Sequence, residues 1–335
     1  MVTDPLREVR TGPALKSLTK RRFMVIGFGV IVAAFAGFTA AGAAATGVVT
    51  GAVASAHNEL TILKAIILGA VEGITEFLPI SSTGHLLVAE RLLNVGQKAA
   101  TKDATDTYTV VIQLGAIAAV LLISWKRVLS LFQGLVGKSE SGRNVLIALV
   151  AAFVPTAVIG LVLDKPIEKH LLRPGVVAAA WIVGGLVIFA LRSHYRSAQT
   201  GGRPLESIMW KHAVIIGVSQ SIAVAWPGTS RSLVTILAAV LLGYSLAAAV
   251  EFSFILGLAT LGAAAMYKLA KDGSVVFDTF GVANPIIGMV VAFVTAAVAV
   301  KWMVAYLNNH DLTGFAGYRI LAGIVTLVLL ATKAI

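Results

Sequence analysis

Apolar runs of roughly twenty residues, the length a helix needs to cross a bilayer, fill most of the chain from about residue 60 to its end. The pattern predicts six uninterrupted spans, at about 108–125, 144–163, 175–191, 251–268, 284–305 and 318–333. Two further apolar segments, at about 60–95 and 207–243, are interrupted near their middles by proline and hydroxyl residues. We therefore expect an all-α, polytopic membrane protein.

The two interrupted segments are similar to one another. Residues 68–88 align without a gap with residues 216–236, and the matched positions include a glycine, a proline and a serine: Gly69 with Gly217, Pro79 with Pro227, and Ser82 with Ser230. A proline removes a backbone donor from a helix, and non-helical backbone at membrane depth survives only where protein or a wet cavity covers it. Each segment is therefore expected to enter the membrane, turn and return as a re-entrant hairpin of two half-helices.

The duplication extends beyond the hairpins. Residues 144–158 resemble residues 284–298, so each repeat consists of one broken-helix hairpin and three spans. An odd number of crossings per repeat inverts the second copy relative to the first. We expect an inverted repeat, with the acidic and histidine motif in residues 57–200 and its counterpart in residues 201–335.

Residues 1–56 precede the repeats and combine a basic start with a Gly/Ala/Val-rich apolar stretch. This segment also resembles a signal peptide, with Ala54-Ser55-Ala56 as its cleavage site. Because the apolar part is longer than such signals usually are, we favour an extra hydrophobic helix that is retained. In either case the basic flank would leave residue 57 on the outer side of the membrane.

The composition agrees with a membrane location, since 58% of the 335 residues are hydrophobic and 13% are charged, with a mean hydropathy of +0.89. The net charge of +11 reflects clusters in short segments between spans, which indicates positive-inside topology rather than nucleic-acid binding. The two most basic loops contain Lys126, Arg127, Lys138 and Arg143, and Arg192, Arg196, Arg203 and Lys211. The segments around 164–174 and 269–283 are then expected outside. The chain has no cysteine, which excludes disulfides, thiolate chemistry and cysteine-held metal.

Acidic residues inside the first hairpin are candidates for chemistry, because charge is costly at membrane depth. Glu72 and Glu76 stand at i and i+4 and share one helix face. One interpretation is that they reach for the interface or pair with Arg231. The interpretation that we favour is a divalent cation shared by the two carboxylates, one of which also serves as a base. Hard carboxylate oxygens favour Mg²⁺ or Ca²⁺ over zinc.

A histidine and an arginine follow the two hydroxyl-rich turns. His85 is interpreted as a general base, an acid or a nucleophile, and the planar fork of Arg231 suits bidentate phosphate binding. The hydroxyl groups that could donate to phosphate oxygens belong to Ser81, Ser82, Thr83, Thr229, Ser230, Ser232 and Thr235.

The start of each returning half-helix is expected to form an anion site. Ser82 or Thr83 is predicted to cap the first of these helices, and Thr229 or Ser230 the second. The free amides at such a start, with the positive end of the helix dipole, attract negative charge. Together these groups fit a doubly charged phosphate with a metal, within reach of lipid.

Three other polar residues lie at membrane depth. We assign Gln113 and Gln220 to hydrogen bonds between helices, and expect Glu251 to pair with a loop cation near the inner surface.

Three motifs occur in order along the chain. Glu72 to Glu76 forms E-x-x-x-E and continues to His85 as LPISSTGH; Pro227 to Thr235 reads PGTSRSLVT; Glu251 to Phe254 reads EFSF. These motifs resemble those of the bacterial undecaprenyl-pyrophosphate phosphatases of the bacitracin-resistance family. The resemblance runs from about residue 60 to the end of the chain, and its three separate motifs make it specific.

The resemblance implies an enzyme that removes the terminal phosphate of undecaprenyl pyrophosphate, giving the lipid carrier of cell-wall precursors. It also implies an outward-facing site in the bacterial cytoplasmic (inner) membrane and dependence on Mg²⁺ or Ca²⁺. By motif position, Glu72 and Glu76 are acidic and metal-binding residues, and Arg231 clamps phosphate. Either Ser82 or His85 is the nucleophile. We favour Ser82, with His85 and Glu76 activating it.

A transporter or flippase for isoprenoid phosphates is the main alternative, because inverted repeats with broken helices are also transporter architecture. A flippase would not need Glu76, His85 and Arg231 together. A structural scaffold would leave the intramembrane charges without a purpose. The expected partners are the lipid substrate and the surrounding membrane lipids, without nucleic acid, and the sequence is compatible with a homodimer.

Overall fold

The structure is a computed structural model that describes residues 59–335, apart from the side chains of residues 163–170. Over this range the chain is helical, and its one strand-like contact is a bridge between Arg203 and Tyr244. The all-α prediction is therefore confirmed for the described part of the chain. The expected extra helix or signal segment within residues 1–56 lies outside the described residues.

Six long helices correspond to the six predicted spans. They are α5 (Ala99–Ile123), α7 (Glu140–His170), α8 (Pro174–Ala190), α12 (Leu246–Phe280), α13 (Ala283–Leu307) and α14 (Thr313–Ala331). Among the described helices, five are long and apolar enough to cross a bilayer by themselves. The exception is α8, which passes only together with α9 (Arg192–Thr200), at a bend of 57°. The chain is a multi-pass membrane protein.

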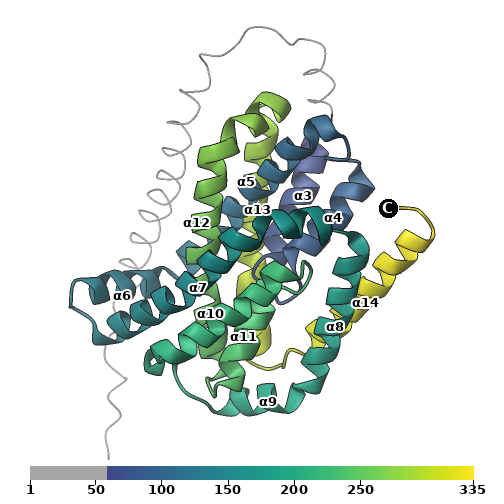
Figure 1. Ribbon diagram of the computed structural model, residues 1–335. Helices are drawn as coiled ribbons and strands as arrows, with labels where there is room; N and C mark the ends of the chain where they lie inside the picture. Colours follow the sequence, from purple (N-terminus) through teal and green to yellow (C-terminus); the bar gives the residue numbers. More distant parts are fainter. Residues whose placement is uncertain (1–58) are drawn as a thin grey trace, which may run out of the picture. The chain divides into compact units, whose positions relative to one another are not determined.

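Each interrupted segment forms two helices joined by a turn (Figure 1). The first consists of α3 (Ile62–Thr75) and α4 (Ser82–Leu93), and the second of α10 (Trp210–Ala225) and α11 (Arg231–Leu241). Pro79 and Pro227 lie in the two turns. The breaks fall where the sequence predicts them because proline has no N–H for a continuing helix.

Glycines allow the first helix of each pair to pack closely against a long helix of the other half of the chain. Helix α3 packs along α13, and α10 packs along α7. A methyl group on Gly69 would lie 2.2 Å from the carbonyl oxygen of Gly288, and one on Gly217 would lie 2.2 Å from that of Ala152. Contacts this close leave room only for hydrogen, so they fix how deeply α3 and α10 sit against their partners.

Ion pairs join the basic loops at one end of the helices. Arg127 of α6 (Trp125–Leu135) contacts Glu206 of a short 3-10 turn, η1 (Leu205–Ser207), and Glu251 of α12, each at 2.7 Å. Asp311, between α13 and α14, binds two arginines of α9 at 3.2 and 3.1 Å. The two most basic loops therefore lie at the same end of the structure, and the predicted pairing of Glu251 with a loop cation is confirmed.

The apolar core surrounds the first of the two turns. Phe77, Leu78 and Ile80 are buried there, together with Leu233 of α11 and Phe254 of α12. The rings of Phe77 and Phe254 meet edge to face, with their centres 5.7 Å apart. This packing holds the residues between α3 and α4 in one conformation.

Candidate active site

The two turns end in the same unusual backbone conformation. Ser81 has a φ of 72° and Ser230 a φ of 77°, values that residues with side chains seldom adopt. Helix α4 begins at the next residue, Ser82, and helix α11 begins at Arg231. The backbone thus pairs Ser81 with Ser230 and Ser82 with Arg231, one position away from the ungapped alignment. Strain of this kind is often found at functional sites.

The capping prediction is confirmed for one helix and wrong for the other. Ser230 caps α11, since its hydroxyl accepts a hydrogen bond of 3.3 Å from the amide of Leu233. The N-cap of α4 is Ser81 rather than Ser82 or Thr83, and its side chain makes no capping hydrogen bond. The serine of positive φ is the second residue after Pro79 in the first turn, but the third residue after Pro227 in the second turn. The first amides of α4 therefore gain no side-chain cap and suit an oxygen-rich ligand.

Glu76 lies where the two turns meet. The hydroxyl of Ser82 donates a hydrogen bond to Oε2 of Glu76. Nη2 of Arg231 donates to Oε1 of the same carboxylate at 3.4 Å. All three side chains are largely buried. One carboxylate thus contacts a helix start from each half of the chain, and the pairing of an acidic residue with Arg231, one of our two interpretations, is present for Glu76.

Arg231 is held on several sides. Its Nη1 donates to the carbonyl oxygen of Ser253, in the EFSF motif, at 3.0 Å. Its guanidinium carbon lies 5.4 Å from the centre of the Phe77 ring. A methyl group on Gly257 would come within 2.4 Å of Nη1, so bare backbone of α12 lies directly beside the guanidinium. The Nε group is buried and finds no hydrogen-bond partner within the described structure.

The predicted phosphate-binding hydroxyl groups divide into three sets. Four of them line a large cavity: Ser81, Ser82, Thr83 and Ser230. Ser232 and Thr235 are instead turned into the protein, where they donate to the Leu78 carbonyl and the Ser253 hydroxyl, each at 2.8 Å. The hydroxyl of Thr229 is buried and unpartnered within the described residues. Ser232 and Thr235 therefore tie α11 to the first turn and to α12.

The large cavity has a volume of about 860 Å³ and a mixed lining. Its polar lining residues include Glu76, Arg231, Gln113, Gln220, Lys268, Lys271 and Asp272. The carbonyl oxygen of the Gln220 side chain is buried and has no partner among the described residues, so the predicted hydrogen bond between helices is not observed at that atom. Much of the remaining wall is apolar and comes from α7, α10 and α12, including Phe153, Leu161, Val224 and Leu261.

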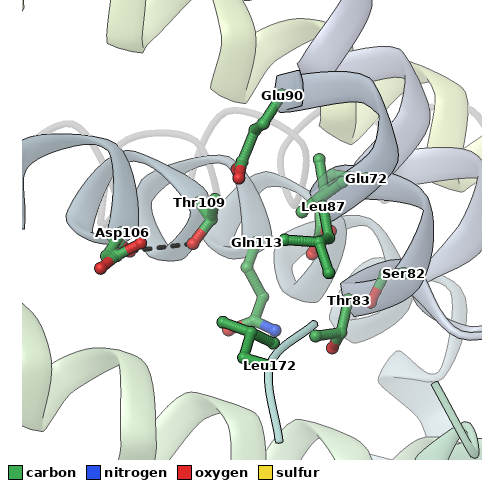
Figure 2. A pocket seen from close by; sticks show the side chains of 10 residues that line it. Glu72, Ser82, Thr83, Leu87, Glu90, Asp106, Thr109, Gln113 and Leu172 are labelled. Atoms are coloured by element: carbon green, nitrogen blue, oxygen red, sulfur yellow. Dashed lines mark hydrogen bonds between the residues drawn. The ribbon is translucent and has the colours of Figure 1, made fainter. Parts of the chain in front are cut away.

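A smaller cavity of about 130 Å³ is acidic. Figure 2 shows the side chains of Glu72, Glu90 and Asp106 around it. Glu72 is only 1% exposed, and its Oε1 makes no hydrogen bond within the described structure. The two cavities share four lining residues, so they adjoin one another: Ser82, Thr83, Asp106 and Gln113.

His85 lines neither cavity. Its Nδ1 lies 2.7 Å from the carbonyl oxygen of Ser81, and its Nε2 lies 2.7 Å from the hydroxyl of Tyr318. Since a carbonyl oxygen only accepts, Nδ1 carries the proton and Nε2 accepts from the tyrosine. The imidazole also packs on Trp181, with ring centres 4.5 Å apart. Both ring nitrogens are thus engaged, while the other three predicted catalytic side chains line the large cavity.

Sequence reasoning missed Arg319, which contacts both turns. Its side chain is fully buried in α14, yet Nη1 donates to the Pro79 carbonyl at 3.1 Å and Nη2 to the Gly228 carbonyl at 3.1 Å. Nη2 also donates to the Ala180 carbonyl at 3.0 Å. An arginine within the last predicted span is the same signal that identified Arg231, and it could have found this residue too.

The fold and the site define a class of protein: a multi-pass helical membrane protein in which a serine, a carboxylate and an arginine from two broken segments meet in the lining of a large cavity. Residues 65–325 match the family described as "Bacitracin resistance protein BacA". The chain belongs to this family, so the resemblance inferred from the three motifs is confirmed.

Named relatives agree with the family match. An undecaprenyl-diphosphatase of Deinococcus deserti is 40% identical over 268 residues, which cover 80% of this chain and 95% of that protein. An undecaprenyl-diphosphatase 2 of Rhodospirillum rubrum is 43% identical over 267 residues, or 79% of this chain and 94% of its own length. An undecaprenyl-diphosphatase of Sorangium cellulosum is 40% identical over 265 residues, covering 78% and 84%.

Proposed function

We propose that this chain hydrolyses undecaprenyl diphosphate to undecaprenyl phosphate and inorganic phosphate, and thereby recycles the lipid carrier of cell-wall precursors. The family and the names of its relatives support this activity. The structural observation that carries the proposal is the contact of Glu76 with both Ser82 and Arg231 in the lining of one large cavity. A nucleophile, a base and a cation at one place are the groups that phosphoanhydride hydrolysis requires.

Ser82 is the proposed nucleophile, with Glu76 as its base. Glu76 takes the hydroxyl proton while the serine oxygen bonds to the terminal phosphorus, and the bond from that phosphorus to the bridging oxygen breaks. The bridging oxygen leaves with the bonding electrons on undecaprenyl phosphate, which receives the proton from Glu76. Water then attacks the phosphoserine, Glu76 accepts a proton from that water and returns it to the serine oxygen, and inorganic phosphate is released. Ser82 is preferred to His85 because it lines the cavity and already donates to a carboxylate.

Arg231 and the two helix starts are proposed to bind the diphosphate. The charge that builds on the transferred group is stabilised by donors already in place, which is the main requirement in phosphoryl transfer. Arg231 has an unused buried Nε donor in addition to its two engaged nitrogens. Ser81, Thr83 and Ser230 line the same cavity and are proposed to donate to phosphate oxygens.

A divalent cation, Mg²⁺ or Ca²⁺, is proposed to bind at Glu72 and Glu76. The unpartnered, buried Oε1 of Glu72 fits this role. Within residues 59–335 no group of three or more histidine, aspartate or glutamate side chains is placed to hold a metal ion. Two carboxylates completed by water and phosphate oxygens match the habit of Mg²⁺, which keeps several waters. Such a cation would neutralise charge on the diphosphate.

The proposed orientation puts the basic loops in the cytoplasm and the site toward the outer face of the bacterial inner membrane. The ion pairs of Arg127 with Glu206 and of Asp311 with α9 support one common side for these loops. Helix α3 of the first repeat packs on α13 of the second, and α10 of the second packs on α7 of the first. This reciprocal packing supports the inverted repeat, because the two hairpins are related in sequence and so are the spans α7 and α13.

The test is phosphate release by the purified, detergent-solubilised chain from undecaprenyl diphosphate with Mg²⁺. Ser82→Ala should abolish release while substrate still binds, and Ser193→Ala, an exposed serine of α9, is the matched control. Ser82→Ala with wild-type turnover would remove Ser82 from the site. Substrate binding without phosphate release by the wild-type chain would favour the alternative, an isoprenoid-phosphate flippase. No specific observation in the described structure favours that alternative.

A further inference from the structure

Two neighbouring residues of α14 reach the backbone of the turns, Arg319 directly and Tyr318 through His85. Arg319 donates to the carbonyl oxygen of Pro79 in the first turn and to that of Gly228 in the second, each at 3.1 Å. Tyr318 reaches the first turn through His85, whose Nδ1 lies 2.7 Å from the carbonyl oxygen of Ser81. One short stretch of α14 thus binds two carbonyl groups of the turns directly and supports a third through His85.

The geometry of Arg319 indicates a positioning function more than a general contribution to folding. Its side chain is fully buried, and its partners in the described structure are main-chain carbonyls rather than a carboxylate. An unneutralised buried cation is expensive, and an apolar side chain of similar volume would usually fill such a space at less cost. Room for the guanidinium is provided by a glycine of α8, because a methyl group on Gly184 would lie 2.3 Å from Nη2.

Two of the carbonyls held by Arg319 or through His85 belong to turn residues of positive φ. Ser81 itself has the left-handed φ that starts α4, and Gly228, with a φ of 95°, precedes the left-handed Ser230. Backbone held in such conformations persists only when surrounding contacts determine it. Releasing these carbonyls would let each turn relax, and the helix starts that carry Ser82 and Arg231 would shift relative to each other.

We propose that Tyr318 and Arg319 are positioning residues that set the spacing between Ser82 and Arg231 across Glu76. The inference rests on the proposed function, since those three side chains are its reacting and binding groups. Tyr318 acts through His85 and the Ser81 carbonyl, and Arg319 acts directly on both turns. In this view His85 supports the turn from behind rather than exchanging protons with the substrate.

The first experiment compares kcat and KM for phosphate release. Arg319→Gln should lower kcat by about a hundredfold, the loss expected for a displacement of about 1 Å at a reacting group, with KM changed less than about threefold. Arg319→Lys, which keeps a cation able to reach carbonyls, should recover part of that loss. Gly184→Ala should also lower kcat, because it displaces the guanidinium without removing it. Gly317→Ala is the control on α14, since its methyl group would meet nothing within 4 Å.

A double-mutant comparison tests the order of contacts from Tyr318 to His85. If Tyr318 acts through His85, then Tyr318→Phe should lower kcat in the wild-type background and have no further effect in His85→Ala. Additive losses in the double variant would overturn that part of the inference. If kcat falls in these variants only in proportion to a fall in melting temperature, and Arg319→Lys rescues neither, the role of Arg319 is merely structural. That outcome would overturn the whole inference.

Hydrogen exchange provides a readout that does not depend on the reaction. In Arg319→Gln, backbone amides of residues 76–84 and 226–232 should exchange faster than in the wild-type chain, while those of α5 and α13 should not change. Unchanged exchange in both turns would refute the positioning role even if activity fell. If the wild-type chain releases no phosphate but Arg319→Gln still exchanges faster at both turns, the positioning role is upheld and the proposed function is refuted.

Discussion

Gly257→Ala should impair catalysis without removing any functional group. Gly257 lies on α12 beside the guanidinium of Arg231, and an added methyl carbon would stand 2.4 Å from Nη1 and 2.7 Å from both Cζ and Nη2. Ordinary contacts of a methyl carbon begin at 3.4 Å. The guanidinium would therefore have to move by about 1 Å, which its flexible side chain allows. That movement would disturb its contacts with Glu76 and with the Ser253 carbonyl.

The expected size of the effect follows from this displacement. A misplacement of about 1 Å at a reacting or binding group can cost on the order of a hundredfold in rate, or about 2.7 kcal/mol of transition-state stabilisation. The free energy of unfolding should change little. Alanine is favoured over glycine in a helix by roughly 0.5–1 kcal/mol, and this offsets the cost of repacking one side chain. Activity and stability should therefore respond separately.

The assay is kcat/KM for phosphate release from undecaprenyl diphosphate, with thermal unfolding followed by circular dichroism. Gly262→Ala is the matched control, because it lies on the same helix and its methyl group would meet nothing within 4 Å. It should keep wild-type activity. Wild-type kcat/KM in Gly257→Ala, or equal losses in both variants, would refute the reasoning that Arg231 acts from its observed position.

Three other predictions follow from the same structure. Glu72→Gln should raise the Mg²⁺ concentration that half-restores the EDTA-treated enzyme by about tenfold or more, and an unchanged titration would remove Glu72 from the cation site. Gly73→Ala should lower the free energy of unfolding by about 1–3 kcal/mol, because its methyl group would lie 2.1 Å from the Thr295 hydroxyl and 2.3 Å from the Ala292 carbonyl; a wild-type melting temperature would contradict this packing. Ser193→Cys, in a chain without native thiols, should react with an impermeant maleimide only after cells are permeabilised, and labelling of intact cells would reverse the proposed topology.

The elements of the fold were predictable because the signals that define them are local. Apolar length determines a span, and all six predicted spans correspond to long helices. Proline determines a break, and Pro79 and Pro227 both lie between helices. The helices α6 and α9 were not expected, because they are short and lie in basic loops that we treated only as charge clusters.

The details of the site were less predictable because they depend on geometry across the chain. The ungapped alignment pairs Ser82 with Ser230, since it follows identical letters. The backbone instead pairs the two residues of positive φ, Ser81 and Ser230. That shift places a hydroxyl at the start of α4 opposite a guanidinium at the start of α11. No local pattern could also show that His85 turns toward Tyr318, a contact that spans most of the described chain.

The contact of Glu76 with both turns explains why charge can be kept at this depth. A carboxylate alone or a guanidinium alone would be a costly buried ion, and removing one partner of such a pair leaves the other uncompensated. In the assembled site, Arg231 balances Glu76 while the Ser82 hydroxyl occupies the other carboxylate oxygen. In the proposed mechanism, a diphosphate that enters the cavity would compete with Glu76 for the guanidinium and so weaken this ion pair as the Ser82 proton moves to the carboxylate. Substrate binding and activation of the nucleophile would thereby be coupled through one residue. Such coupling serves hydrolysis, whereas a protein that only moved the lipid across the membrane would gain nothing from it.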